Sequence, residues 1–188
     1  MQVWGLVDNF GENIDSFQVL SSTTSRERLE KELVSVALSC GLDGINIDFE
    51  SLPVEAGPHF IQFLRELSVS CRRNNLVLSV DNYVPAGYNR YYDYAEQGVL
   101  ADYVIIMAYD EHYAGSAEAG SVSSISYVEN AIKDTKEMVP AEKIVVALPF
   151  YTRLWKETTV DGVTILGLER SPGMNDAAAI LEDNDAAA

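Results

Sequence analysis

The sequence has little of what metal sites, disulfide-stabilised folds and nucleic-acid-binding surfaces require. Its 188 residues include two cysteines, Cys40 and Cys71, and two histidines, with no metal-ligand spacing among them. We therefore expect buried free thiols, no metal and no cofactor. With 13 Lys and Arg against 29 Asp and Glu, the net charge is −16, which argues against a nucleic acid or an anionic membrane as partner.

Long apolar runs and a targeting leader are also missing. No window is long and apolar enough to span a bilayer. Residues 1–10, MQVWGLVDNF, have neither the basic start nor the apolar centre of a signal peptide. They are typical of the middle of a strand, so we expect further chain before them.

Strand-like and helix-like segments alternate along the chain. Nearly continuous apolar runs, typical of strands covered on both faces, occupy residues 3–10, 43–49, 76–85, 102–110 and 143–151. Helical patterns between them occupy residues 24–41, 57–75, 91–100 and 126–139. Capping boxes are expected at Thr24 with Glu27 and at Ser126 with Glu129, and a C-terminal glycine at Gly41. This alternation predicts βα units around a parallel sheet.

A parallel α/β fold is either a doubly wound open sheet or a (β/α)8 barrel. An open nucleotide-binding sheet carries a glycine-rich phosphate turn after an early strand, and no turn here has that spacing. Polar residues instead gather where the strands end, as in barrel enzymes: Asp8, Asn9, Asp48, Glu50, Asp81, Asn82, Tyr109, Asp110 and Tyr151. The sequence favours a TIM barrel. A whole barrel takes about 250 residues, so we expect a partial one.

Residues 43–50, DGINIDFE, place polar side chains at every second position. Asn46, Asp48 and Glu50 alternate with large apolar residues, so in a strand the three share one face. Burial and an anionic neighbour raise the pKa of a carboxyl group, and a carboxyl group that stays protonated near neutral pH can act as a general acid. The segment therefore predicts catalytic carboxylates at the end of a strand.

Two other interpretations of residues 43–50 remain open. A calcium loop takes oxygen ligands at alternate positions and a glycine at its sixth position, whereas the sixth residue counted from Asn46 is Ser51. A solvated strand edge would leave the interleaved apolar residues without a packing partner. Catalytic carboxylates are the preferred interpretation.

Three segments resemble glycoside hydrolase family 18, whose members are (β/α)8 barrels acting on polymers that contain N-acetylglucosamine. DGINIDFE resembles its D-x-x-D-x-D-x-E signature, residues 107–113 (MAYDEHY) resemble its M-x-Y-D segment, and residues 147–155 (ALPFYTRLW) resemble its seventh strand. The resemblance covers residues 1–156 and makes them strands three to seven. Within the family, the chain is most similar to bacterial spore-cortex lytic N-acetylglucosaminidases.

The resemblance implies a role for each matched residue. Glu50 would be the general acid, and the substrate's own 2-acetamido group would replace an enzyme nucleophile. Asp48 would accept a hydrogen bond from the acetamido N–H, and the Tyr109 hydroxyl would hold the acetamido carbonyl. These three are the expected catalytic residues, and the phenol and the carboxylates are expected to meet in one cleft.

Four further residues are expected to contact substrate: Asn46, Met107, Asp110 and Tyr151. Asn46 departs from the signature, because many family members carry an aspartate there. An amide can donate a hydrogen bond to Asp48 and removes one repelling charge. We therefore expect Asp48 to ionise more readily than in relatives with the aspartate.

The resemblance also predicts the setting of the protein. We expect residues 1–188 to be the central fragment of one catalytic barrel, with residues 157–188 forming a loop and helical segment after strand seven. Exposed edges of such a barrel would support a homo-oligomer. The expected partner is an N-acetylglucosamine-containing polysaccharide, either peptidoglycan of spore cortex or chitin, outside the cell, in the cell wall or on the spore. The alternatives are a non-catalytic, lectin-like barrel and an unrelated barrel hydrolase.

Overall fold

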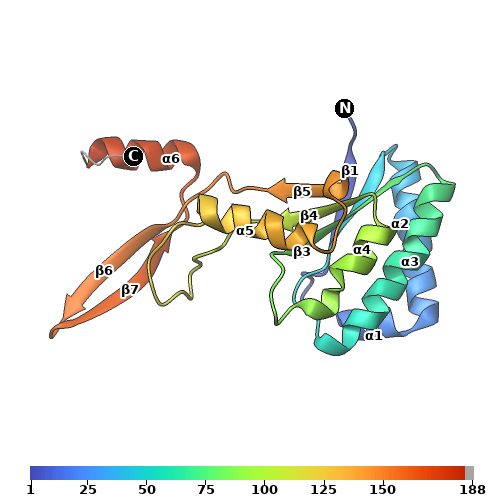
Figure 1. Ribbon diagram of the computed structural model, residues 1–188, viewed down its shortest axis with the longest axis horizontal. Helices are drawn as coiled ribbons and strands as arrows, with labels where there is room; N and C mark the ends of the chain where they lie inside the picture. The colour runs from blue at the N-terminus through green and yellow to red at the C-terminus, as the bar shows by residue number, and fades with distance from the viewer. Residues whose placement is uncertain (185–188) are drawn as a thin grey trace. The chain divides into compact units, whose positions relative to one another are not determined.

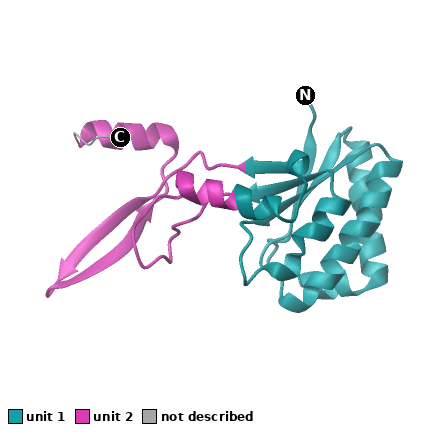
Figure 2. Ribbon diagram, in the orientation of Figure 1, with its two compact units in different colours: residues 1–107, 132–146 teal, residues 108–131, 147–188 magenta. Residues whose placement is uncertain are grey.

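The computed structural model describes residues 1–184 (Figure 1). The chain divides into two compact units, which Figure 2 colours separately. The first unit contains Met1–Met107 and Ile132–Val146, and the second contains Ala108–Ala131 and Ala147–Ala188. No helix in the described part of the chain has the length and apolar character needed to cross a membrane.

The first unit is built on a five-stranded sheet in which the strands follow one another in sequence order. The strands are β1 (Trp4–Asp8), β2 (Gly44–Asp48), β3 (Val77–Tyr83), β4 (Tyr103–Met107) and β5 (Ile144–Ala147). β1 pairs with β2, β2 with β3 and β3 with β4, each time in parallel. All five strands lie within the strand segments that the sequence predicts, and parallel strands end at the same edge of a sheet.

Helices connect these strands and cover one face of the sheet (Figure 1). They are α1 (Ser16–Ser21), α2 (Thr23–Ser39), α3 (Gly57–Arg73) and α4 (Tyr94–Leu100), with short 3-10 turns η1 (Val54–Ala56), η2 (Arg90–Tyr92) and η3 (Ala141–Lys143). A further helix, α5 (Ile125–Lys136), precedes η3 and β5. The predicted alternation of strands and helices is therefore present, with α1 as an additional short helix.

The apolar residues of β2 form the centre of the core under α3. Ile45 and Ile47 are 2% and 0% exposed, and Phe49 follows them on the same face. The ring of Phe49 stacks on Phe63 of α3 at 5.9 Å between centroids and also contacts Phe60 at 6.0 Å. The apolar face of β2 thus faces the helices, which leaves Asn46 and Asp48 on the opposite face of the sheet.

Helix ends differ in detail from the predicted caps. Ser22 caps α2, because its hydroxyl accepts a hydrogen bond from Ser25 N at 3.3 Å while its own backbone is extended. Ser124 Oγ accepts from Tyr127 N at 3.2 Å at the start of α5. In both helices the predicted cap lies two residues too late, because a second hydroxyl residue precedes it. Gly41 has φ of +65° at the end of α2, as a C-terminal glycine requires.

The two cysteines lie in different environments. Cys71 on α3 is 1% exposed, and burial raises the pKa of its thiol to about 12. Cys40 is exposed, so the expectation of a buried thiol is wrong there. Cys40 is the C-cap residue of α2, and Val36 one turn earlier is also 56% exposed, so this end of the helix face is not covered.

The second unit contains a β-hairpin that is absent from the elements predicted from the sequence. β6 (Leu154–Val160) and β7 (Val163–Arg170) pair antiparallel and are followed by α6 (Met174–Asp183). Their turn is Asp161–Gly162, both with positive φ, which is a favoured two-residue hairpin turn. Strands thus occupy part of the segment 157–188 for which loop and helix were expected. Residues 185–188 of that segment lie outside the described residues.

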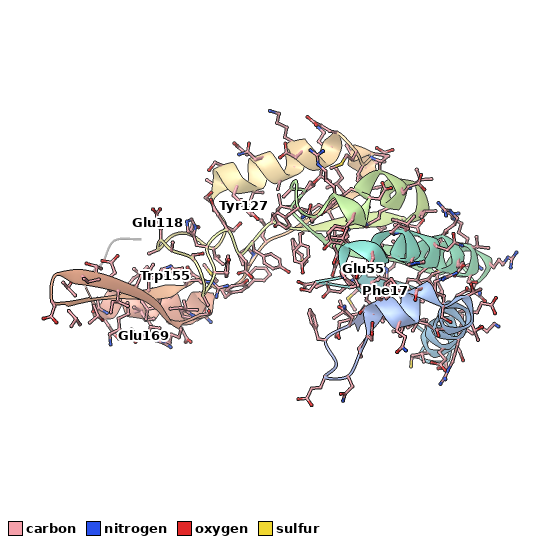
Figure 3. All side chains as sticks on the ribbon, turned by 90° about the horizontal axis from the view of Figure 1, so that it is seen from below. Phe17, Glu55, Glu118, Tyr127, Trp155 and Glu169 are labelled. Carbon is pink, nitrogen blue, oxygen red and sulfur yellow. The ribbon has the colours of Figure 1, made fainter. Side chains whose placement is uncertain are left out.

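Trp155 anchors the start of the hairpin within the second unit (Figure 3). Its indole Nε1 donates a hydrogen bond to the carbonyl of Gly120 at 3.1 Å. The long loop that contains Gly120 is thereby fastened to β6.

Candidate active site

The face of the sheet opposite the helices carries a row of three aspartates. Asp8 of β1 is the register partner of Asp48 in β2. Ile47 is the partner of Val80 in β3, so the next position along places Asp48 beside Asp81. Neighbouring strands are about 4.8 Å apart and register partners share a face. Three adjacent strands therefore present a carboxylate at the same level.

Asn46 precedes Asp48 by two residues on the same face of β2, and its side chain forms hydrogen bonds with residues of β3. Its side-chain oxygen accepts a hydrogen bond from Ser79 Oγ at 2.6 Å, and its Nδ2 donates to Asp81 Oδ2 at 2.9 Å. The amide was expected to donate to Asp48. It donates to Asp81 instead, because Ser79 fixes the orientation of the amide and directs its N–H groups toward the end of β3.

The Asp48 carboxyl group holds its proton unusually strongly. Burial, followed by the negative charges of Asp81, Glu50 and Asp8, raises its pKa to about 6. Its Oδ1 is buried and has no hydrogen-bond partner among the described residues. The expectation that Asp48 ionises more readily than in relatives with an aspartate at position 46 stays a prediction, although the pKa of Asp48 is well above that of a free aspartate. The amide at position 46 carries no charge, but Asp8 and Asp81 on the neighbouring strands and Glu50 beyond the end of β2 supply three.

Asp81, like Asp48, has a raised pKa and a buried carboxylate oxygen. Burial raises its pKa, the hydrogen bond from Asn46 opposes that change, and the charge of Glu50 adds to it. Its Oδ1 is also buried without a hydrogen-bond partner in the described part of the chain. Two carboxyl groups with raised pKa values thus lie on adjacent strands.

Glu50 lies just beyond the end of β2, where its backbone is held by Asn9. Asn9 Oδ1 accepts from Glu50 N at 2.9 Å, and Asn9 Nδ2 donates to Glu50 O, also at 2.9 Å. The same Nδ2 donates to Ser16 Oγ at 2.9 Å. A side chain at the end of β1 therefore fixes the main chain of the predicted acid, and the Glu50 side chain is half-buried.

The residues around Glu50 are held by tyrosines from the next strand and loop. Ser51 adopts the left-handed region with φ of 52°, and its N–H donates to Tyr83 Oη at 3.1 Å. Burial raises the pKa of Tyr83, and a hydrogen bond with Glu50 adds to that change. Tyr92 Oη donates to Phe49 O at 3.1 Å. This support leaves Glu50 with a defined position at the edge of the sheet.

An open hollow of about 440 Å³ adjoins Glu50 in the first unit. Its lining includes Asn9, Phe10, Ile14 and Pro53. Phe10 is 61% exposed, so it offers an uncovered aromatic ring beside the acid.

Met107 is the other predicted site residue in the first unit. It ends β4 as the register partner of Tyr83, and it is buried. Its parity puts it on the carboxylate-bearing face of the sheet. Among residues 1–184, no group of three or more His, Cys, Asp or Glu side chains is arranged to hold a metal ion.

The second unit brings three predicted residues together. Tyr151 Oη donates to Asp110 Oδ1 at 2.8 Å, and the rings of Tyr109 and Tyr151 lie 6.4 Å apart at 72°. Arg153 forms an ion pair with Asp110, and its guanidinium carbon lies 5.5 Å from the Tyr151 ring centre. Burial and the hydrogen bond to Asp110 raise the pKa of Tyr151 to about 12. The meeting of Tyr109 with the carboxylates stays a prediction.

Asn9, Asp81 and Tyr83 are not among the site residues that the sequence predicts. All three lie at strand ends, and Asn9 and Asp81 are among the polar residues that the sequence places there. The missing information was the register between strands. A pairing of Asn46 with Ser79 puts Asp81 beside Asp48 and Tyr83 beside Glu50.

Parallel strands joined by helices, with carboxylates at the carboxyl ends of neighbouring strands, are typical of the end of a (β/α)8 barrel at which active sites form. Residues 9–185 match the family model of glycosyl hydrolases family 18. The chain belongs to this family, and its sheet is part of a (β/α)8 barrel, as predicted.

Several curated proteins of Bacillus subtilis are similar to the chain. The "Putative sporulation-specific glycosylase YdhD" is 35% identical over 144 residues, which are 73% of this chain and 34% of that protein. The cortical fragment-lytic enzyme is 31% identical over 143 residues, covering 73% of this chain and 33% of that protein. The chain thus spans about a third of the length of these relatives.

Solved structures agree on the fold. The crystal structure of YdhD from Bacillus subtilis superposes with a TM-score of 0.84 at 26% identity, covering 96% of this chain and 61% of that chain. The spore cortex-lytic enzyme SleL of Bacillus cereus gives a TM-score of 0.81 at 21% identity, covering 95% and 42%.

Proposed function

We propose that the protein hydrolyses β-linked N-acetylglucosamine polymers, with Glu50 as the general acid that protonates the glycosidic oxygen. The observation that carries this proposal is the position of Glu50 just beyond the carboxyl end of β2, two residues after Asp48, with its main chain fixed by Asn9. A general acid must be held within hydrogen-bond reach of the leaving oxygen. A fixed backbone and a half-buried side chain suit that task.

Asp48 takes part in a substrate-assisted, retaining mechanism in this proposal. The 2-acetamido oxygen attacks the anomeric carbon while the glycosidic C–O bond breaks and Glu50 protonates the leaving oxygen, and ionised Asp48 accepts a hydrogen bond from the acetamido N–H as positive charge develops on the ring that forms. Water then attacks the anomeric carbon and gives a proton to Glu50, and the acetamido group leaves that carbon with the configuration retained. Because the pKa of Asp48 is about 6, activity falls as the pH drops through that value. The acid limb of the pH profile for kcat/KM reports this ionisation.

Residues outside the carboxylate row receive binding roles on the strength of the family resemblance. The Tyr109 hydroxyl holds the acetamido carbonyl in line for attack. Met107 lines the floor of the sugar site, and Asp110 and Tyr151 contact the sugar. The support within the second unit is the hydrogen bond between Asp110 and Tyr151, which orients both side chains.

The polymer is peptidoglycan of the spore cortex or chitin. Relatives named for sporulation and cortex lysis favour the cortex, and they suggest that the protein works at the spore or the cell wall. Soluble cortex fragments and chitin oligosaccharides, supplied separately, distinguish the two substrates.

The deciding experiment compares wild-type full-length protein with Glu50→Gln on an N-acetylglucosaminide. We expect turnover by the wild type, its loss by at least about 10²-fold in the variant and unchanged substrate binding. Glu55→Gln is the matched control, because Glu55 is an exposed glutamate on η1, five residues farther along the chain (Figure 3). Equal turnover by wild type and Glu50→Gln would reject the assignment of Glu50 as the general acid. Binding without turnover by the wild type would indicate a lectin-like barrel.

A further inference from the structure

Asn46 carries an amide where the family signature has an aspartate, and the carboxylate of Asp81 lies next to it on β3. Asn46 Nδ2 donates a hydrogen bond to Asp81 Oδ2 at 2.9 Å, so the amide and the carboxylate are in direct contact. Parity puts Asp81 on the same face as Asp48, at the neighbouring position of the adjacent strand. An acidic side chain therefore stands beside Asp48 although residue 46 has none.

The hydrogen bond from Asn46 occupies only one oxygen of Asp81. Asp81 Oδ1 is buried and has no hydrogen-bond partner among residues 1–184, and the same holds for Asp48 Oδ1. A buried carboxylate oxygen without a donor is costly unless the group carries a proton. Two such oxygens on adjacent strands favour a state in which at least one of the two carboxyl groups is protonated.

We propose that Asp81 is a positioning residue that controls the protonation of Asp48, supplying from β3 the second carboxylate that the family signature places at position 46. Asn46 holds Asp81 in place, and Ser79 in turn orients Asn46 at 2.6 Å. This role rests on the proposed function, because it assigns Asp81 to the same reaction. The raised pKa values of both carboxyl groups agree with it.

Charged neighbours of Asp48 come from three elements. β1 contributes Asp8, the end of β2 contributes Glu50 and β3 contributes Asp81, with Asp81 exerting the largest effect of the three charges on the pKa of Asp48. β4 contributes Ile105 as the register partner of Asp81, which carries no charge. Removing Asp81 should therefore change the pKa of Asp48 more than removing any other single charge.

The test measures the pKa of Asp48 directly, by nuclear magnetic resonance titration of carboxyl carbons in the full-length protein. Asp81→Asn keeps a hydrogen-bonding partner for Asn46 and removes the charge. We expect the pKa of Asp48 to fall by about 1 unit and the acid limb of kcat/KM to move with it. Glu12→Gln, which removes a charge from an exposed loop, should move neither.

Two further variants exclude a purely structural effect. Asn46→Asp alone adds a carboxylate and should raise the pKa of Asp48 further, without depending on the folding of an Asp81 variant. The double variant Asn46→Asp with Asp81→Asn moves the carboxylate into β2 and should restore a pKa near that of the wild type. A structural loss would not be rescued by this exchange.

The outcomes separate this inference from the proposed function. An unchanged pKa of Asp48 in Asp81→Asn, with the fold intact, overturns the inference. A lowered pKa in a protein that does not hydrolyse N-acetylglucosaminides supports the control of Asp48 by Asp81 and rejects the proposed function. A lowered pKa together with a shifted acid limb supports both.

Discussion

Replacing Asn9 by alanine tests whether the fixed backbone of Glu50 matters for catalysis. Asn9 makes three hydrogen bonds of 2.9 Å, two to the backbone of Glu50 and one to Ser16. At about 1 kcal/mol net for each bond, the variant should lose about 2–3 kcal/mol of unfolding free energy. For a chain of this size, that lowers Tm by roughly 5–10 °C.

The catalytic effect of Asn9→Ala should exceed what the stability loss explains. A displacement of the acid by about 1 Å can cost about 10²-fold in rate, so we expect kcat to fall by that order while KM changes little. The assay is steady-state turnover of an N-acetylglucosaminide at a temperature where circular dichroism shows the variant fully folded.

Asn89 provides a matched control for the loss of stability. It is buried, accepts from Ala86 N at 2.8 Å and donates to Val84 O at 2.9 Å, so it also fixes a loop backbone with one carboxamide. Asn89→Ala should lower Tm by a comparable amount with a much smaller loss of kcat. If Asn9→Ala keeps the wild-type kcat, or if the two variants lose equal activity, the hydrogen bonds from Asn9 do not position Glu50 for catalysis.

Three other substitutions test the electrostatics and the packing of the first unit. Because the folded pKa of Asp48 is about 6 and that of an unfolded aspartate is about 3.9, its ionisation destabilises the fold above pH 6 and has no effect below about pH 3.9. Asp48→Asn should thus have a higher Tm than the wild type at pH 7 and an equal Tm at the acid end, and a constant difference would contradict the raised pKa. Phe49→Ala should cost about 3–5 kcal/mol in urea unfolding, whereas a loss below about 1 kcal/mol would mean that its stacking on α3 contributes little. Gly44→Ala places a Cβ 2.7 Å from Val77 O and 2.8 Å from Trp4 Cδ1, so we expect a lower Tm and altered tryptophan fluorescence, and unchanged spectra would contradict the close contact.

The order of strands and helices could be predicted because it depends on local periodicity. Five apolar runs of strand length separated by helical patterns correspond to β1–β5 and to α2–α5. The hairpin of β6 and β7 escaped prediction although Asp161 and Gly162 are a strong turn signal. Its strands are largely exposed, so they lack the continuous apolar character that marked the others.

The strand that carries the proposed catalytic carboxylates could be predicted for the same reason, but the residues beside it on the neighbouring strands could not. Parity within residues 43–50 is enough to put Asn46 with Asp48 and the interleaved apolar residues against α3. Which residue of β3 stands beside Asp48 depends on where β3 begins. That start follows from the packing of α3 and the turn after it, which are tertiary properties rather than local ones.

A shift of β3 by one residue would reverse the electrostatics of the site. Because side chains alternate with a period of two, such a shift would turn Asp81 toward the helices and bring Val80 or Asn82 to the carboxylate face. Asp48 would then lose the neighbouring charge that raises its pKa most, and Asn46 would lose its hydrogen-bond acceptor. The amide at position 46 therefore does not predict an easily ionised Asp48. Its effect is set by the strand beside it, where the register supplies a carboxylate that the signature segment itself lacks.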